Sequence, residues 1–213
     1  MTNKKLEFGF SLIEMAMVLL IISLIIASLL QPLSTQVDQI KLKTTEQNLE
    51  TIKESLLGFL VINNRLPYPA SNPETGIEDS SLEGQEGYLP WATLALDGSK
   101  TDAWGQTFRY RVDAEYTNQP FPELPANTSN SLKIRDLQNT PLTNENASSD
   151  VIAIIYSKGK DGQANKENGG TIDNIYTQDV FIENNFDDRL IFLPKTIVIN
   201  RLVQAGLIKL PSP

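Results

Sequence analysis

The hydrophobic residues of this 213-residue chain are concentrated near its N-terminus. Residues 10–30 read FSLIEMAMVLLIISLIIASLL, and Glu14 is the single charged residue among them. As an α-helix this segment would extend about 31 Å, which is close to the hydrocarbon thickness of a bilayer. We therefore predict a transmembrane helix over residues 10–31.

The residues on either side of the apolar segment predict its orientation. Lys4 and Lys5 precede it, and positively charged flanks stay in the cytoplasm. The sequence Leu30-Gln31-Pro32 that follows lacks the small-x-small site of a cleaved secretory signal. The pattern predicts a single-pass protein whose N-terminus is cytoplasmic and whose remaining residues lie across the membrane.

An amphipathic helix is predicted over residues 32–64. Apolar residues recur near the i, i+3, i+4 spacing of one helix face, at Val37, Ile40, Leu49, Ile52, Leu56, Phe59 and Leu60. Pro32 removes one backbone hydrogen bond, so we expect a kink or local melting there. Leu66-Pro67-Tyr68-Pro69 cannot continue a helix, which must end before it.

Residues 65–213 are predicted to form a globular β-rich head. The alternation over residues 108–112 predicts a strand, and a short strand is expected at 132–135. Residues 151–156 are apolar on both faces, which is typical of a central strand. Residues 70–88 are interpreted as a solvated acidic loop, and residues 195–205 as a short closing helix that Gly206 ends. The expected fold class is α+β, with an antiparallel sheet, long loops and a short C-terminal helix.

Composition excludes several functions. The formal net charge of −8 argues against a nucleic-acid partner, because phosphate binding needs a basic surface; Arg109, Arg111, Lys133 and Arg135 are the candidates for a local basic patch. The chain has neither cysteine nor histidine, which removes thiolate chemistry and the commonest general base. Carboxylate or Ser–Lys catalysis would remain, but no motif for either stands out. We therefore expect a protein that is not an enzyme.

The string Gly9-Phe10-Ser11-Leu12-Ile13-Glu14 closely resembles the processing motif of type IV prepilins and type II secretion pseudopilins. The resemblance implies a leader of residues 1–9, removed after Gly9 by a prepilin peptidase, and N-methylation of Phe10. It also implies that Glu14 pairs with the N-terminal amine of a neighbouring subunit. Such a pair has a physical basis, since opposite charges about 4 Å apart attract by roughly 4 kcal/mol at an effective dielectric constant near 20.

The same resemblance implies a pilin-like fold, in which the long N-terminal helix packs on the antiparallel head. The expected location is the bacterial inner membrane, with the head in the periplasm and the subunit later in a filament. Partners would be the peptidase, other pilin or pseudopilin subunits and the inner membrane. The filament is a type IV pilus-like fibre or, alternatively, a type II secretion pseudopilus. A single-span anchored binding module is the third interpretation.

Two segments of the head carry further resemblances to pseudopilins. Residues 102–110 are similar to their Asp-Pro-Trp-Gly turn and strand, although Ala103 replaces the proline.

The chain has no cysteine pair near its C-terminus and its head is rich in loops, which differs from many major pilins. These features suggest a minor subunit.

Residues 157–162 resemble the Ser-x-Gly-x-Asp-Gly turn that opens a calcium loop in the main pseudopilins. The resemblance implies Asp161 and Asp173 as candidate calcium ligands. Nearby lysines lower the local negative charge, so a glycine-rich hairpin turn without cofactor is the alternative. Asp187 and Asp188 could similarly hold a cation, but we favour a role in capping a turn.

Overall fold

The structure is a computed structural model that describes residues 9, 11–118, 132–144, 151–169, 174–182 and 185–208. For residues 28–34 it describes the helical backbone but not the side chains. The chain divides into two compact units, residues 1–42 and 43–213, which are described separately here. Helix α1, Leu12–Asn63, begins in the first unit and ends in the second.

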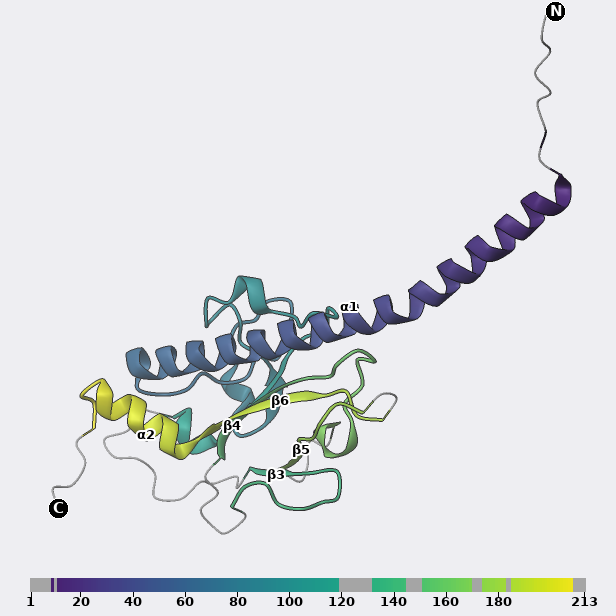
Figure 1. The fold of residues 1–213 in the computed structure, drawn as a ribbon. Helices are drawn as coiled ribbons and strands as arrows, with labels where there is room; N and C mark the ends of the chain where they lie inside the picture. Colours follow the sequence, from purple (N-terminus) through teal and green to yellow (C-terminus); the bar gives the residue numbers. More distant parts are fainter. Residues whose placement is uncertain are drawn as a thin grey trace, which may run out of the picture. The chain divides into compact units, whose positions relative to one another are not determined.

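The second unit is built on a four-stranded antiparallel sheet (Figure 1). Its strands are β1 (Glu86–Tyr88), β2 (Arg109–Val112), β4 (Val151–Ser157) and β6 (Arg189–Pro194), in the order β1-β2-β4-β6. Strands β3 (Lys133–Arg135) and β5 (Ile175–Thr177) form a separate parallel pair. The expected α+β class and antiparallel sheet are thereby confirmed.

Two hydrophobic cores lie on opposite faces of the four-stranded sheet. One contains α1 residues such as Ile52 and Leu56 together with Tyr110 and Ile155 of the sheet. The other contains residues of β3 and β5 together with Ile154 and Tyr156 of β4, Ile134 and Tyr176 among them. All seven residues of β4 are buried, which confirms the prediction of a central strand.

Within the second unit, α1 packs through residues spaced three and four apart. Leu49, Ile52, Leu56 and Leu60 are at most 3% exposed. The helix ends at Asn63, one residue before the predicted bound and before Leu66 as expected, and Asn64 takes the left-handed conformation with a φ of 52°.

Two parts of the expectation for the predicted 32–64 helix are wrong. Val37 and Ile40 are 44% and 65% exposed, so they are not part of the buried stripe. Of the kink or local melting expected at Pro32, the melting does not occur, because the helix runs through Pro32 without a break; the kink stays a prediction. A proline removes one backbone hydrogen bond, and the helical turns on both sides maintain the helix.

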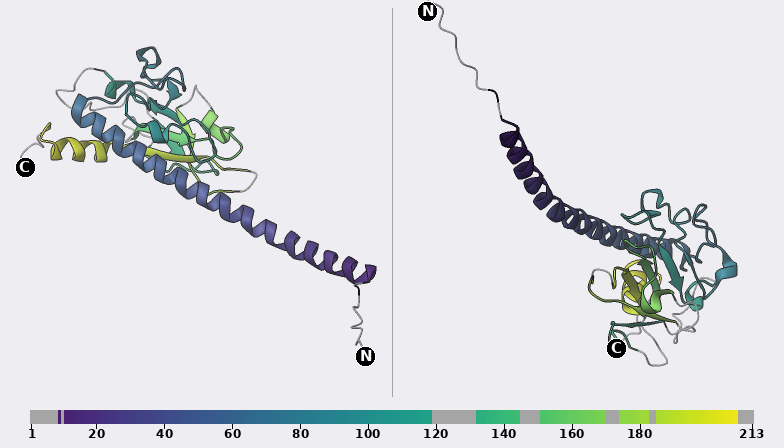
Figure 2. Two further views of the ribbon diagram at one scale, coloured as in Figure 1. Left: turned by 90° about the horizontal axis from the view of Figure 1, so that it is seen from above. Right: turned by 90° about the vertical axis from the view of Figure 1, so that its right-hand side faces the viewer.

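Helix α2, Lys195–Gln204, confirms the predicted closing helix. Val198 and Leu202 are fully buried in the core that α1 shares, and Arg201 forms an ion pair with Glu54 of α1. Both views of Figure 2 show α2 beside the C-terminal part of α1. Gly206 follows with a φ of +72°, which fits its predicted role as the helix stop.

The expectation that residues 70–88 form a solvated loop is wrong in two respects. Residues 86–88 form strand β1, which pairs with β2. Glu78 is only partly exposed, because both of its carboxylate oxygens accept hydrogen bonds of 2.8 Å from Arg65. Two of the acidic residues of this segment, Glu78 and Glu86, thus pair with arginines at least 13 residues away in sequence, which the local composition does not reveal.

Four short 3₁₀ turns complete the described elements. They lie at Ser80–Leu82, Asp97–Ser99, Ala114–Tyr116 and Lys166–Gly169. The last of them carries Asn168, which is fully buried and is important for the site described below.

Candidate functional site

The beginning of α1 presents apolar side chains to its surroundings on every side. All the large hydrophobic residues from Leu12 to Ile26 are at least 46% exposed, and Leu12 reaches 93%. A continuous apolar surface of this kind is unusual for a soluble monomer and marks a site of protein or membrane contact. This segment is therefore the first candidate functional region.

A helix with the length and apolarity needed to cross a membrane is not found in the part of the chain that the structure describes. The predicted span of residues 10–31 includes Phe10 and the side chains of residues 28–31, which lie outside the described residues. The predicted boundaries of the leader, the span and the head are not tested by the structure and stay predictions.

Glu14 and Ser11 form a reciprocal capping arrangement at the start of α1. The Ser11 backbone N–H donates to Glu14 Oε2 at 2.8 Å, and the Glu14 N–H lies 3.3 Å from Ser11 Oγ. Each side chain thus satisfies a backbone donor that the first helical turn leaves without a partner. The Ser-x-x-Glu spacing is readable in the sequence, and it gives Glu14 a local role that the resemblance to prepilins does not mention.

The other predicted processing residues are only partly described. Gly9 is exposed, and a Cβ added at this position would meet no atom within 4 Å. Phe10, the predicted first mature residue, lies outside the described residues. A side chain at residue 9 is therefore free of steric conflict with the fold, so a substitution there tests recognition of the site rather than folding.

The structure describes only one of the two candidate calcium ligands, so their pairing stays a prediction. The exposed Asp161 carboxylate accepts a 2.7 Å hydrogen bond from the Gln163 N–H, while Asp173 lies outside the described residues. Across the described ranges, no group of three acidic side chains is placed to hold a metal ion. Gly159 and Gly162 have φ values of 63° and 70°, as in the glycine-rich turn that was the alternative.

Asp187 and Asp188 cap this turn, as favoured from the sequence. The Asp161 N–H donates to Asp187 Oδ2 at 3.0 Å. The Asn165 N–H and Asn168 Nδ2 both donate to Asp188 Oδ2 at 2.8 Å. The pKa of Asp188 is raised to about 7, mainly because burial excludes the water that would stabilise its charge, and to a smaller extent because of the nearby Asp187 and Asp161.

A buried polar network occupies the face of the sheet opposite α1. Glu86 Oε1 accepts a 2.9 Å hydrogen bond from Arg109 Nε and forms an ion pair with Arg109 Nη2 at 2.9 Å. The Tyr176 hydroxyl donates to Glu86 Oε2 at 2.8 Å. The Tyr156 hydroxyl lies 3.1 Å from Oε1 and also contacts the carbonyl of Asn168. Burial raises the pKa values of both tyrosines, so their hydroxyls stay protonated and act as donors.

The candidate basic patch is not assembled on the surface. Arg109 is bound to Glu86, and Arg111 is only 5% exposed, with its Nη2 donating to Asn174 Oδ1. Lys133 and Arg135 belong to the separate β3–β5 pair. Two of the four predicted basic residues are thus committed to the interior, where they have no access to phosphates.

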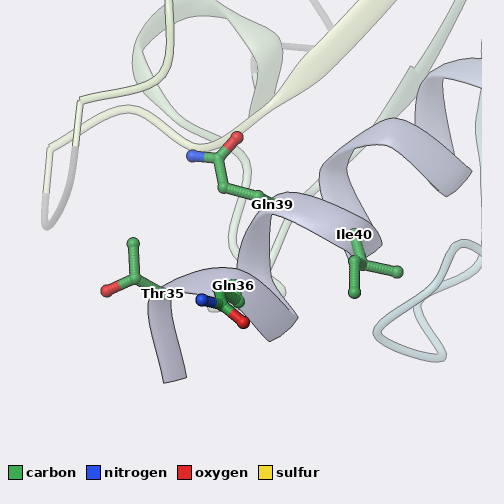
Figure 3. Close-up of a pocket in the computed structure, with 4 residues that line it drawn as sticks. All are labelled: Thr35, Gln36, Gln39 and Ile40. Atoms are coloured by element: carbon green, nitrogen blue, oxygen red, sulfur yellow. The ribbon is translucent and has the colours of Figure 1, made fainter. Parts of the chain in front are cut away.

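A shallow hollow of about 500 Å³ lies along α1 in the first unit (Figure 3). Its described lining consists of Thr35, Gln36, Gln39 and Ile40, all from consecutive turns of one helix. These side chains offer no acid, base or metal ligand, so the hollow gives no indication of catalysis.

Comparison of the chain with protein-family models, curated proteins and solved structures finds no match.

Proposed function

We propose that this chain is a structural subunit of a type IV pilus-like filament, processed after Gly9 and assembled through its N-terminal helix. The observation that carries the proposal is the exposed apolar surface of residues 12–26, with Glu14 in the first helical turn. Removing one large aliphatic side chain from water is worth about 1.5–3 kcal/mol, so this surface gains strongly from being covered. A bilayer before assembly and neighbouring subunits afterwards would provide that cover.

Glu14 distinguishes this proposal from a simple anchored module. A carboxylate within an apolar helix is costly in a membrane, and a plain anchor gains nothing from it. In a filament the processed amine of a neighbouring subunit would offset this cost and favour one register. A type II secretion pseudopilus requires the same features and is the alternative assembly. In either filament the subunit acts by assembly rather than catalysis, with its head in the periplasm.

The first test is the mass of the full chain extracted from membranes, with and without a co-expressed prepilin peptidase. We expect the peptidase to convert the wild type to a chain that begins with N-methylated Phe10. Gly9→Val should block this conversion without changing the head, because residue 9 is exposed. A wild-type chain that keeps residues 1–9 in the presence of active peptidase would refute the proposal.

A second test separates the two roles of Glu14. Glutamine satisfies a capping box nearly as well as glutamate but carries no charge to attract an amine. We therefore expect Glu14→Gln to be cleaved normally and to keep a stable head. Its amount in sheared filaments should be no more than about one-tenth of the wild-type level. A tenfold decrease corresponds to the loss of roughly 1.4 kcal/mol of pairing energy. Normal incorporation of Glu14→Gln would show that Glu14 acts only as a helix cap. Ser11→Ala is the matched variant, since it removes a capping group and leaves the charge.

A further inference from the structure

The chain contains one Asn-Gly dipeptide, Asn168-Gly169, at the end of the 3₁₀ turn Lys166–Gly169. Asparagine followed by glycine is the pair in which deamidation is chemically easiest, because glycine has no side chain to hinder an attack by its own backbone nitrogen. Asn168 is nonetheless fully buried. The residue therefore combines a reactive sequence with a protected position.

Three hydrogen bonds hold the Asn168 side chain in the folded head. Its Oδ1 accepts from the Thr177 N–H at 2.7 Å, and its Nδ2 donates to the Thr177 carbonyl at 3.0 Å. The same Nδ2 also donates to Asp188 Oδ2 at 2.8 Å. Both polar atoms of the amide are thus bound to β5 and to the residue that precedes β6, and this fixes the side chain away from the backbone of Gly169.

Two of these three hydrogen bonds depend on the amide nitrogen of Asn168. An ionised carboxylate in its place has no hydrogen to donate. The Thr177 carbonyl and Asp188 Oδ2 would then face another acceptor, and a buried acceptor that loses its partner carries the full cost of its desolvation. Asp188 Oδ1 already has no hydrogen-bond partner among the described residues, so the site has no spare donor to compensate. Conversion of this one amide to an acid would therefore weaken the attachment of β5.

We propose that Asn168 is a modification site, at which spontaneous deamidation converts the residue that holds β5 in place into one that releases it. The Gly169 backbone nitrogen bonds to Asn168 Cγ, the Cγ–Nδ2 bond breaks, and ammonia leaves with the proton of the Gly169 N–H. Water then opens the cyclic imide at either of its carbonyls and leaves an aspartate or an isoaspartate at residue 168. One water is consumed and one ammonia is released, so the reaction needs no oxidant or reductant.

The fold controls when this reaction can occur. Ring closure requires rotation of the Asn168 side chain, which the three hydrogen bonds prevent. The reaction therefore proceeds from a locally opened state, in which the 3₁₀ turn separates from β5. Strands β3 and β5 have three residues each and form a sheet of their own, so this part of the head is suited to local opening. The inference concerns the head alone and stands independently of the filament proposal.

The first test measures deamidation in the full chain in detergent micelles, incubated in mildly alkaline buffer with and without unfolding concentrations of urea. Peptide masses locate the replacement of an amide by an acid at Asn168. We expect conversion in the unfolded chain to be at least about tenfold faster, which corresponds to an opening free energy of about 1.4 kcal/mol or more. Gly169→Ala should slow conversion of the unfolded chain, because the added methyl group hinders the attacking nitrogen.

The second test asks whether the product releases β5. Asn168→Asp should accelerate amide exchange at Thr177 and Gln178 at least about tenfold, because their N–H groups bond to Asn168 and to the Arg135 carbonyl of β3. Asn139→Asp is the matched control. The exposed Asn139 accepts a hydrogen bond from Arg135 through its Oδ1, so a carboxylate there keeps the contact and adds the same charge.

The same comparison can be made on an aged wild-type sample if Asn168→Asp does not fold. Peptides that carry the acid at residue 168 differ in mass from unconverted ones, and they should show the faster exchange in the same tube. A folded chain that is never converted, or equal rates of conversion in folded and unfolded chains, would overturn the proposal. Unchanged exchange at Thr177 after conversion, or equal acceleration by Asn139→Asp, would do so as well.

Discussion

Replacing Glu86 with alanine is expected to lower the free energy of unfolding of the head by about 3–5 kcal/mol. The Glu86 side chain is 4% exposed, and the Arg109 side chain that it binds is 15% exposed. Removing the carboxylate leaves the buried Arg109 guanidinium without its counter-charge and the Tyr176 hydroxyl without its acceptor. Arg111, opposite Glu86 in the β1–β2 register, adds a second buried positive charge to the same region.

The expected loss measures the cost of an unpaired charge rather than the net value of the ion pair. A buried pair replaced by apolar residues of similar size often causes little change in stability. We therefore expect the double variant Glu86→Met with Arg109→Met to lose clearly less than the sum of the two single variants. Glu50→Ala is the control at the surface, because its pair with Lys53 is exposed and worth at most about 0.5 kcal/mol.

Urea unfolding of the full chain in micelles measures these differences. The emission of Trp91 and Trp104, the two tryptophans of the chain, reports on the head. A loss for Glu86→Ala below about 1 kcal/mol, or strict additivity in the double variant, would show that the network contributes little to stability.

The elements predicted correctly are those whose signal is local. Strand β4 is recognisable from its unbroken apolar run, and α2 from its periodic apolar residues and the following Gly206. The end of α1 follows from the prolines after residue 65, which no helix can accommodate. In each case a few adjacent residues restrict the backbone strongly enough to determine the element.

The elements missed are those that depend on distant partners. Strand β1 contains Glu86 and Gly87, which are poor strand formers, and it exists because β2 pairs with it. A Cβ at Gly87 would lie 2.7 Å from Pro69 Cβ, so the glycine permits a close approach of its backbone to Pro69 that no local sequence pattern indicates. The parallel pairing of β3 and β5 joins segments some forty residues apart, and their short sequences do not specify it.

The candidate sites show the same contrast between local sequence signals and dependence on distant residues. The Ser11–Glu14 capping arrangement has a sequence signature, so it could have been predicted alongside the prepilin resemblance. The role of Asn168 could not have been predicted, because an asparagine in a polar loop gives no sign that its side chain is buried. Its side-chain amide exchanges hydrogen bonds with the backbone of Thr177 at 2.7 and 3.0 Å and donates to Asp188, which joins the turn to β5.

Replacing Asp188 with asparagine is expected to stabilise the head above neutral pH and to flatten its dependence on pH. The folded-state pKa of Asp188 is raised from 3.8 to about 7, mainly by burial. Between these two values the folded state holds a proton that the unfolded state has released, so stability falls as pH rises through about pH 4–7. A shift of three pH units sets an upper limit of about 4 kcal/mol on this loss.

Asparagine suits the site because its amide oxygen can accept the hydrogen bonds that Asn165 and Asn168 donate to Asp188 Oδ2. Its amide nitrogen would replace Oδ1, which has no hydrogen-bond partner among the described residues. Urea midpoints of wild type and Asp188→Asn, measured from pH 4 to pH 8.5, should converge at the acidic end and separate by at least about 1 kcal/mol at the basic end. Asp187→Asn is the matched control, because its side chain caps the same turn while burial, the main cause of the raised pKa of Asp188, remains. Most of the pH dependence should therefore persist in this variant. If the urea midpoints of wild type and Asp188→Asn changed in parallel with pH, Asp188 would be ionised in the folded head throughout this range. The two amide hydrogen bonds to Asp188 would then compensate for the burial of its charge.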